Sequence, residues 1–179
     1  MVFIAGIGSR QSPEIICSEM VKIGRWAASN GHTIRSGHAD GADYAFETGA
    51  QKSSAIYLPW PNFNSQLPML GQPVVVPERN DLDTLVNKFH PAPERLTRGA
   101  RALMRRNGCQ VLGFDLNEPA AAVVCWQGKT KGGTQQAISI AIGHGIPVLN
   151  MADERFDTAE KVIAELVRII GGAAWLELK

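Results

Sequence analysis

The sequence predicts an α/β fold in which a mainly parallel sheet is covered by helices on both faces. First, a strand, a turn and a helix follow one another repeatedly along the chain. Second, the apolar strand segments do not alternate with polar residues, which is typical of strands buried on both faces. Third, 179 residues with 45% hydrophobic and 20% charged residues suit one sizeable core. We therefore expect a single domain over residues 1–179.

The first half of the chain predicts three strands and two helices. Val2–Gly8 is an apolar run that ends in glycines, which predicts a strand and a tight turn. Residues 13–29 follow with apolar side chains at helical spacing. A second strand is predicted at His32–Arg35, then a helix that runs to about Gln51, and a third strand at Ala55–Trp60.

Residues 61–93 break this succession. Six prolines fall within the range, and Val74–Val76 is too short to predict a strand. We expect a long loop or small insertion here. Such a connection in a compact domain often serves as a lid or binding loop.

The second half of the chain returns to alternating helices and strands. Residues 108–119 give no clear pattern. The predicted elements are a helix over Pro93–Asn107, a buried strand at Ala121–Trp126, a helix over Thr134–His144, a strand at Ile146–Asn150 and a closing helix over Thr158–Ile170.

Composition excludes several classes of protein. A net charge of +1 excludes a global positive field of the kind that coats DNA, so any nucleic-acid role must depend on a local patch. Three widely spaced cysteines without neighbouring histidines predict no metal site and no disulfide framework. The N-terminus shows no signal peptide, and no segment is long and apolar enough for a membrane span. We expect a cytoplasmic protein with no membrane partner and no cofactor.

Three strand-to-helix turns carry residues suited to a phosphate. In an open parallel sheet, ligands bind beyond the carboxyl ends of the strands, where helix N-termini present free N–H groups. The first turn is Gly6–Arg10. Gly8 lets the backbone approach a ligand, Ser9 offers a hydroxyl, and Arg10 can bind a phosphate through two hydrogen bonds. An ordinary tight turn explains the glycines equally well.

The second turn, Ser36–Asp43, is dense in glycine and aspartate. Helix capping by Asp40 and Asp43 explains both carboxylates. Alternatively, one of them binds a ribose hydroxyl or acts in catalysis with Glu47, which lies one turn further along the same helix face as Asp43. His38 suits an ordinary loop residue or a general base. The candidate ligand-binding residues here are Ser36, Gly37, Asp40 and Gly41.

The third turn, Lys129–Thr134, follows the strand that ends at Trp126. Gly132, Gly133 and Thr134 at the start of a helix would form a nest of backbone N–H groups, to which two lysines add charge. The three turns should converge on one edge of the sheet, because the carboxyl ends of parallel strands share that edge. Trp126 or Trp60 could stack on a base there.

A cluster of arginines marks the helix predicted before residue 107. Five of the chain's eleven arginines fall within 95–106, and at helical spacing they share one arc. They are either a solvated face paired with nearby acids or a phosphate-backbone track or nucleotide clamp that includes Arg105 and Arg106. Asn107 falls on the buried side. The arginines are Arg95, Arg98, Arg101, Arg105 and Arg106, and the candidate acidic partners are Glu78, Asp81, Asp83 and Glu94.

Four motifs within residues 1–150 resemble the Rossmann-like core of the DNA-processing protein A (Smf) family. They also resemble the wider SLOG nucleotide-binding superfamily, which includes the lysine-decarboxylase-like phosphoribohydrolases. This resemblance implies a Rossmann-like three-layer fold, a homo-oligomer, and a site for a nucleotide or single-stranded DNA at the carboxyl edge of the sheet. The motifs are Gly8-Ser9-Arg10, Ser36-Gly37-x-Ala39-x-Gly41-x-Asp43, Arg105-Arg106-Asn107 and Gly132-Gly133-Thr134.

The sequence departs from the phosphoribohydrolases in one respect. Their Pro-Gly-Gly-x-Gly-Thr motif is closely followed by a catalytic glutamate, whereas Gln135 and Gln136 follow Thr134 here. The resemblance therefore favours a stand-alone core that binds a phosphate-bearing nucleotide or nucleotide-derived ligand.

Besides a structural or scaffold role with a vestigial site, two alternative functions stay open. One is a single-stranded DNA-binding protein that uses the arginine-faced helix 94–107. The other is a nucleotide N-glycosidase or deoxyribosyl-transfer enzyme, in which Asp43 or Glu47 attacks or stabilises the anomeric carbon.

Overall fold

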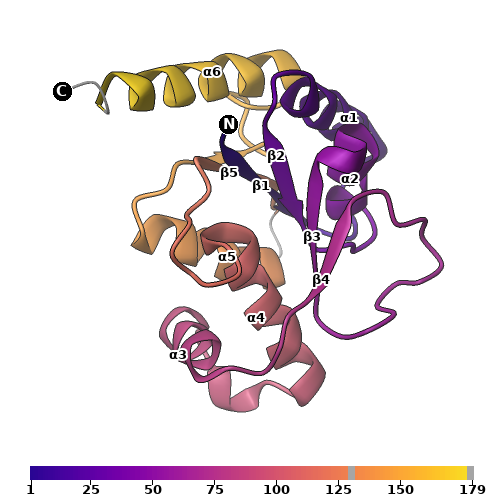
Figure 1. Cartoon of the computed structure of the whole chain (residues 1–179), viewed down its shortest axis with the longest axis vertical. Coiled ribbons are helices and arrows are strands. Elements are labelled where there is room, and N and C mark those ends of the chain that lie inside the picture. The colour runs from indigo at the N-terminus through magenta and orange to yellow at the C-terminus, as the bar shows by residue number, and fades with distance from the viewer. Residues whose placement is uncertain (129–131, 177–179) are drawn as a thin grey trace.

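The computed structural model describes residues 1–128 and 132–176, and its centre is a six-stranded parallel sheet (Figure 1). The strand order is β4-β3-β2-β1-β5-β6, so the predicted α/β fold with a parallel sheet is confirmed. The strands are β1 (Phe3–Gly8), β2 (Thr33–Ser36), β3 (Ser54–Leu58), β4 (Gln72–Val75), β5 (Ala122–Trp126) and β6 (Val148–Asn150).

Helices cover both faces of the sheet and complete a three-layer fold. Figure 1 shows α1, α2 and α6 on one side and α3, α4 and α5 on the other. No helix in these described ranges is long and apolar enough to cross a membrane. The helices are α1 (Glu14–Ser29), α2 (Ala42–Ala50), α3 (Asn80–Phe89), α4 (Arg98–Leu112), α5 (Gly133–Gly143) and α6 (Ala159–Leu176), with short 3-10 turns η1 (Gln51–Ser53) and η2 (Pro93–Arg95).

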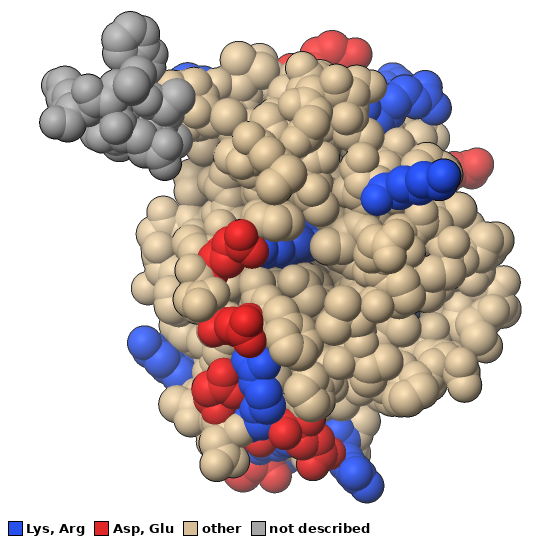
Figure 2. All heavy atoms as spheres, in the orientation of Figure 1, with Lys and Arg blue, Asp and Glu red and all other residues tan. Residues whose placement is uncertain are grey.

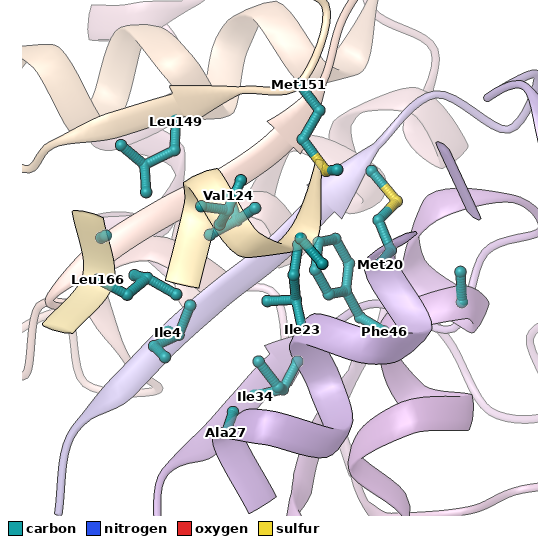
Figure 3. Packing of buried hydrophobic residues seen from close by; sticks show 14 of the residues in the cluster. Ile4, Met20, Ile23, Ala27, Ile34, Phe46, Val124, Leu149, Met151 and Leu166 are labelled. Atoms are coloured by element: carbon teal, nitrogen blue, oxygen red, sulfur yellow. The ribbon is translucent and has the colours of Figure 1, made fainter. Parts of the chain in front are cut away.

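Side chains of the central strands pack alternately into two hydrophobic clusters. Ile4 of β1 packs with α1, α2 and α6, and Figure 3 shows it near Leu166 in this cluster. Ala5 and Ile7 belong to the cluster on the opposite face, with residues of α4 and α5. Close packing of α1 on α2 requires Gly24 and Gly49, because a Cβ on either would overlap the backbone of the other helix.

The order of the strands creates a switch point between β1 and β5. From β1 the chain adds β2, β3 and β4 on one side, then returns to pair β5 with the other side of β1, with Gly8 opposite Trp126. The helix after β1 covers one face and the helix after β5 covers the other. The crevice beyond the carboxyl ends of two such strands is where open parallel sheets bind ligands.

The segment predicted as a loop or small insertion contains regular structure. Strand β4 pairs with β3 at the edge of the sheet, where Pro73 is tolerated, and α3 packs beside α4. Helix α3 buries only three residues, Leu82, Leu85 and Val86.

The arginine-rich helix differs from its predicted range at both ends. It begins at Arg98, where the Thr97 hydroxyl accepts a hydrogen bond from the Ala100 N–H. Arg95 lies in the separate 3-10 turn η2, so its predicted place in the same helix as the other four arginines is wrong. It continues through buried residues to Leu112 and ends at Gly113, whose φ of 83° suits glycine. The segment that gave no pattern is therefore partly helical.

Candidate functional site

A cavity of about 450 Å³ opens at the switch point between β1 and β5. Its walls come from the turns after β1 and β5, the start of α5, one residue of α2 and one face of α4. The volume lies in the usual range of small-molecule sites. Predicted site residues that line it are Gly8, Ser9, Arg10, Asp43, Arg106, Asn107, Trp126, Gly132, Gly133 and Thr134.

The turn after β1 is held against its neighbours through its backbone. Ser9 N–H donates to the Trp126 carbonyl at 3.2 Å, and the Ser9 carbonyl accepts from Ala42 N–H at 3.3 Å. These bonds connect the turn to β5 and to the start of α2. Arg10 is exposed at the cavity and makes no ion pair with any residue of the described ranges.

Arg106 is the buried cation of the cavity. Its side chain is 7% exposed, and Nη1 donates to Asp43 Oδ2 at 3.0 Å and to Gln110 Oε1 at 2.7 Å. Its Nε is buried and has no hydrogen-bond partner among the described residues. Gly37 makes room for the guanidinium, which a Cβ at that position would overlap.

Asp43 is the carboxylate that the cavity presents. Its side chain is 2% exposed. Burial raises the pKa of Asp43 to about 6, and the attraction of Arg106 only partly opposes that increase. Burial also lowers the pKa of Arg106. Because an arginine stays charged even so, the pair is ionic near neutral pH.

Glu47 does not line the cavity, and both of its carboxylate oxygens contact His38. Glu47 Oε1 accepts from the His38 backbone N–H at 2.9 Å, and Oε2 lies 2.7 Å from His38 Nδ1. Both side chains are fully buried. The hydrogen bond to Glu47 raises the pKa of His38 against the effect of burial. His38 has a φ of 57°, so Glu47 stabilises a backbone conformation that is uncommon outside glycine.

Of the second turn, Ala39 lines the cavity beside Asp43, whereas Ser36, Gly37, Asp40 and Gly41 do not. Ser36 donates its hydroxyl to the Asp43 carbonyl at 3.1 Å, and Gly41 has a φ of 74°. Asp40 is exposed, and the predicted cap by its side chain is wrong, because Gly41 precedes α2 and no side chain caps that helix. Asp43 does lie in the first turn of α2.

The third wall of the cavity is the start of α5. Gly132 is its N-cap residue, and the helix starts at Gly133. Asn107 Nδ2 donates to the Gly133 carbonyl at 3.1 Å and to Gln136 Oε1 at 3.2 Å, which fixes this end of α5 to α4. The predicted contribution of Lys129, Thr130 and Lys131 lies outside the described residues.

The arginine face of α4 is neutralised by acidic residues around α3. Arg98 lies 3.2 Å from Glu78, and Asp83 binds Arg101 and Arg105 at 3.3 and 2.9 Å. Figure 2 shows acidic and basic side chains side by side toward the end of the molecule where Figure 1 draws α3. The pairing alternative therefore holds for these arginines, and Arg105 does not line the cavity. Arg95 pairs with Glu94, and Asp81 pairs with Arg79.

Sequence reasoning missed the amides that support the cavity. Gln110 holds Arg106 and Gln136 holds Asn107. The spacing could have revealed Gln110, because it follows Arg106 by four residues and side chains four residues apart meet on a helix.

Comparison with known proteins shows a similarity at the level of the fold. No family model matches the chain, and no curated protein sequence matches it. Among solved structures, it is similar to DNA processing protein A from Helicobacter pylori, described for its single-stranded DNA binding mode, with a TM-score of 0.59 and 20% identity. The match covers 82% of this chain and 63% of that one, so this chain spans less than two thirds of its length. The two proteins share a fold.

Proposed function

We propose that this protein binds a phosphate-bearing nucleotide or nucleotide-derived ligand in the cavity between β1 and β5. The observation that carries this proposal is Arg106, a cation more than nine-tenths buried in that cavity, with a guanidinium N–H that has no partner among the described residues. A buried polar group without a partner is costly unless a ligand or water completes its hydrogen bonds.

The other groups in the cavity suit the same ligand. Arg10 supplies a second cation, and the N-terminus of α5 supplies free N–H groups and a partial positive charge. Trp126 lines the cavity at the end of β5, and its indole would stack on the base of the ligand. The ligand's phosphate would lie between Arg10, Arg106 and the start of α5.

Single-stranded DNA is the second candidate ligand. It is favoured by the shared fold with a protein described as binding single-stranded DNA. The same cavity is the better surface for it than the arginine face of α4, because Arg98, Arg101 and Arg105 are already paired with acids.

Titration calorimetry with mononucleotides, cyclic nucleotides and short oligodeoxynucleotides tests this proposal. We expect binding that Arg10→Ala weakens by roughly tenfold or more, the usual value of a hydrogen bond to a charged group. Arg25→Ala removes an exposed arginine from α1 and should change nothing. Absence of binding, or equal loss in both variants, would contradict the proposal.

The N-glycosidase alternative depends on Asp43, because Glu47 is occupied by His38. Chromatography of the same nucleotide mixtures after incubation would detect free base. Base release that Asp43→Asn abolishes would establish the enzyme, and its absence would leave a binding protein.

A further inference from the structure

Residues 59–71 form a loop without helix or strand between β3 and β4 (Figure 1). The loop starts at the carboxyl end of β3, and because the sheet is parallel this is the edge at which the cavity between β1 and β5 opens. None of the loop residues lines that cavity. The loop contacts the site through residues that do line it.

Phe63 makes these contacts. It is 8% exposed and packs in a small hydrophobic cluster with Ala39 and Leu103, which both line the cavity. The Arg10 guanidinium lies over the Phe63 ring, 5.9 Å from its centre and within reach of a cation–π interaction. The Trp60 ring packs edge-to-face against Phe63, with 5.1 Å between the ring centres.

A hydrogen bond fastens the loop to the turn after β2. Asn64 Nδ2 donates to the His38 carbonyl at 3.0 Å, and Glu47 in turn holds the backbone N–H and the ring of His38. His38, Asn62 and Asn64 all have positive φ, at 57°, 61° and 54°. Non-glycine residues persist in this conformation where their surroundings over-determine it, and they cluster at functional sites.

Arg10 is the residue of the site that gains most from such support. It is exposed and makes no ion pair with any residue of ranges 1–128 and 132–176. A long side chain loses rotamer freedom when it binds a ligand, and a contact that orders it beforehand lowers that cost. Its backbone is already confined, since an added Cβ on Gly41 would lie 2.7 Å from the carbonyl oxygens of Ser9 and Arg10.

We propose that Phe63 is a positioning residue of the anion site. Its ring holds the Arg10 guanidinium at the cavity, and the hydrogen bond from Asn64 to the His38 carbonyl holds the loop that carries Phe63. This inference rests on the proposed function, in which Arg10 binds the phosphate. Because Phe63 does not line the cavity, it acts on the ligand only through Arg10.

A double-mutant cycle tests this role by calorimetry with adenosine and thymidine 5′-monophosphates. Phe63→Leu keeps an apolar side chain in the cluster but removes the ring face, so it should weaken binding by roughly threefold. In an Arg10→Ala background the same substitution should cause no further loss, because the group that Phe63 positions is gone. Phe114→Leu is the control: Phe114 also lies against an arginine, Arg79 at 5.0 Å, but neither lines the cavity, so affinity should not change.

Asn64→Gly tests the attachment of the loop. Glycine adopts positive φ readily, so the variant removes the hydrogen bond to His38 without straining the backbone. We expect a loss of roughly twofold to threefold in affinity. Asn62→Gly adds the same backbone freedom two residues earlier, at an exposed side chain that makes no hydrogen bond within the described ranges, and should keep the full affinity.

These measurements separate the positioning role from the proposed function. Equal losses from Phe63→Leu with and without Arg10, or no loss in either background, would overturn the positioning role and leave the proposed function intact. Asn64→Gly binding as tightly as Asn62→Gly would overturn the attachment through His38. If no nucleotide binds the unchanged protein, the proposed function and the positioning role are both wrong.

Discussion

The Asp43 carboxylate already binds the Arg106 guanidinium, the group that a phosphate ligand would contact. Asp43 and Gln110 each accept a hydrogen bond from Nη1 of the guanidinium. A phosphate bound to Arg106 would bring a second negative charge next to the Asp43 carboxylate, and a nearby like charge favours the protonated carboxyl. Binding of an anion and protonation of Asp43 should therefore be linked.

Affinity for an anionic ligand should rise as pH falls from 7.5 to 5.5. The pKa of Asp43 is about 6 in the free protein and should be higher beside a bound phosphate, so binding takes up a proton. We expect a gain of roughly threefold to tenfold over this range. Calorimetry with a cyclic nucleotide measures it, because a phosphodiester does not titrate there.

Asp43→Asn distinguishes this linkage from titration of His38, whose pKa is also raised. The variant should bind with little dependence on pH. A pH dependence that persists in Asp43→Asn would assign the proton to His38 and contradict the linkage to Asp43.

Gly37 tests the position of Arg106 through stability. In Gly37→Ala the new Cβ would overlap the guanidinium and push it from Asp43 and Gln110. We expect a loss of about 2 kcal/mol or more in the free energy of unfolding, as is typical of overpacking a buried site. Urea denaturation measures it. Gly132→Ala is the matched control, since no atom of residues 1–128 or 132–176 lies within 4 Å of its added Cβ, and a similar loss there would refute the steric explanation.

At the level of elements, β4 shows how an exposed sheet edge can resist pairing. Val76 N–H donates to the Leu58 carbonyl, so Val76 and every second residue before it turn their backbone groups toward β3. The outward-facing backbone positions are Pro73, Val75 and Pro77. Two of these three lack an N–H, which leaves little for another strand to bind.

Replacing both outward prolines should make the protein self-associate through β4. Pro73→Thr with Pro77→Thr restores two N–H donors on an edge that already exposes Val74 and Val75. Light scattering after size-exclusion chromatography should show more dimer or larger species than for the unchanged chain. Pro68→Thr, in the loop before β4, is the control. An unchanged mass distribution would show that the prolines do not protect the edge.

At the scale of the whole molecule, the net charge of +1 is a sum that does not show where the cations lie. Arg98, Arg101 and Arg105 are neutralised locally. The cavity presents Arg10 and Arg106 against one carboxylate, Asp43.

Binding of single-stranded DNA should therefore depend only weakly on salt. With about two phosphates neutralised, the logarithm of affinity should fall with a slope of about −1.4 against the logarithm of salt concentration. A track of five arginines would give about −3.5. Fluorescence anisotropy of a labelled oligonucleotide from 50 to about 300 mM salt measures the slope. A slope near the steeper value, reduced in Arg101→Gln, would restore the arginine face as the DNA surface.

Much of the fold was predictable, because the strands and helices of the β–turn–α repeat show as local patterns of apolar residues in the sequence. β4 and α3 were missed since neither is stable or recognisable alone: β4 is a four-residue, proline-containing edge strand, and α3 buries only three residues. Parallel topology by itself predicts that the turns converge on one edge of the sheet. The cavity at the switch point agrees with that expectation.

The individual roles of neighbouring side chains were not predictable. Arg105 and Arg106 are adjacent in sequence and equally buried, yet one pairs with Asp83 outside the cavity and the other lines the cavity. Asp43 and Glu47 share a helix face, yet only Asp43 reaches the cavity. Which of two candidates points inward depends on how far a helix is rotated against the sheet, and tertiary packing decides that angle.

The position of β1 at the switch point also has a consequence for how the molecule assembles. Ile4 of β1 pairs with Ala122 of β5, so one side of the earliest strand stays open until most of the chain exists. Contacts between such distant residues close slowly, since a long loop must first be ordered. The half of the sheet with β1 to β4 can form first, and the cavity is complete only when β5 arrives. A chain that stops before β5 would expose an unpaired apolar strand edge and be prone to aggregate.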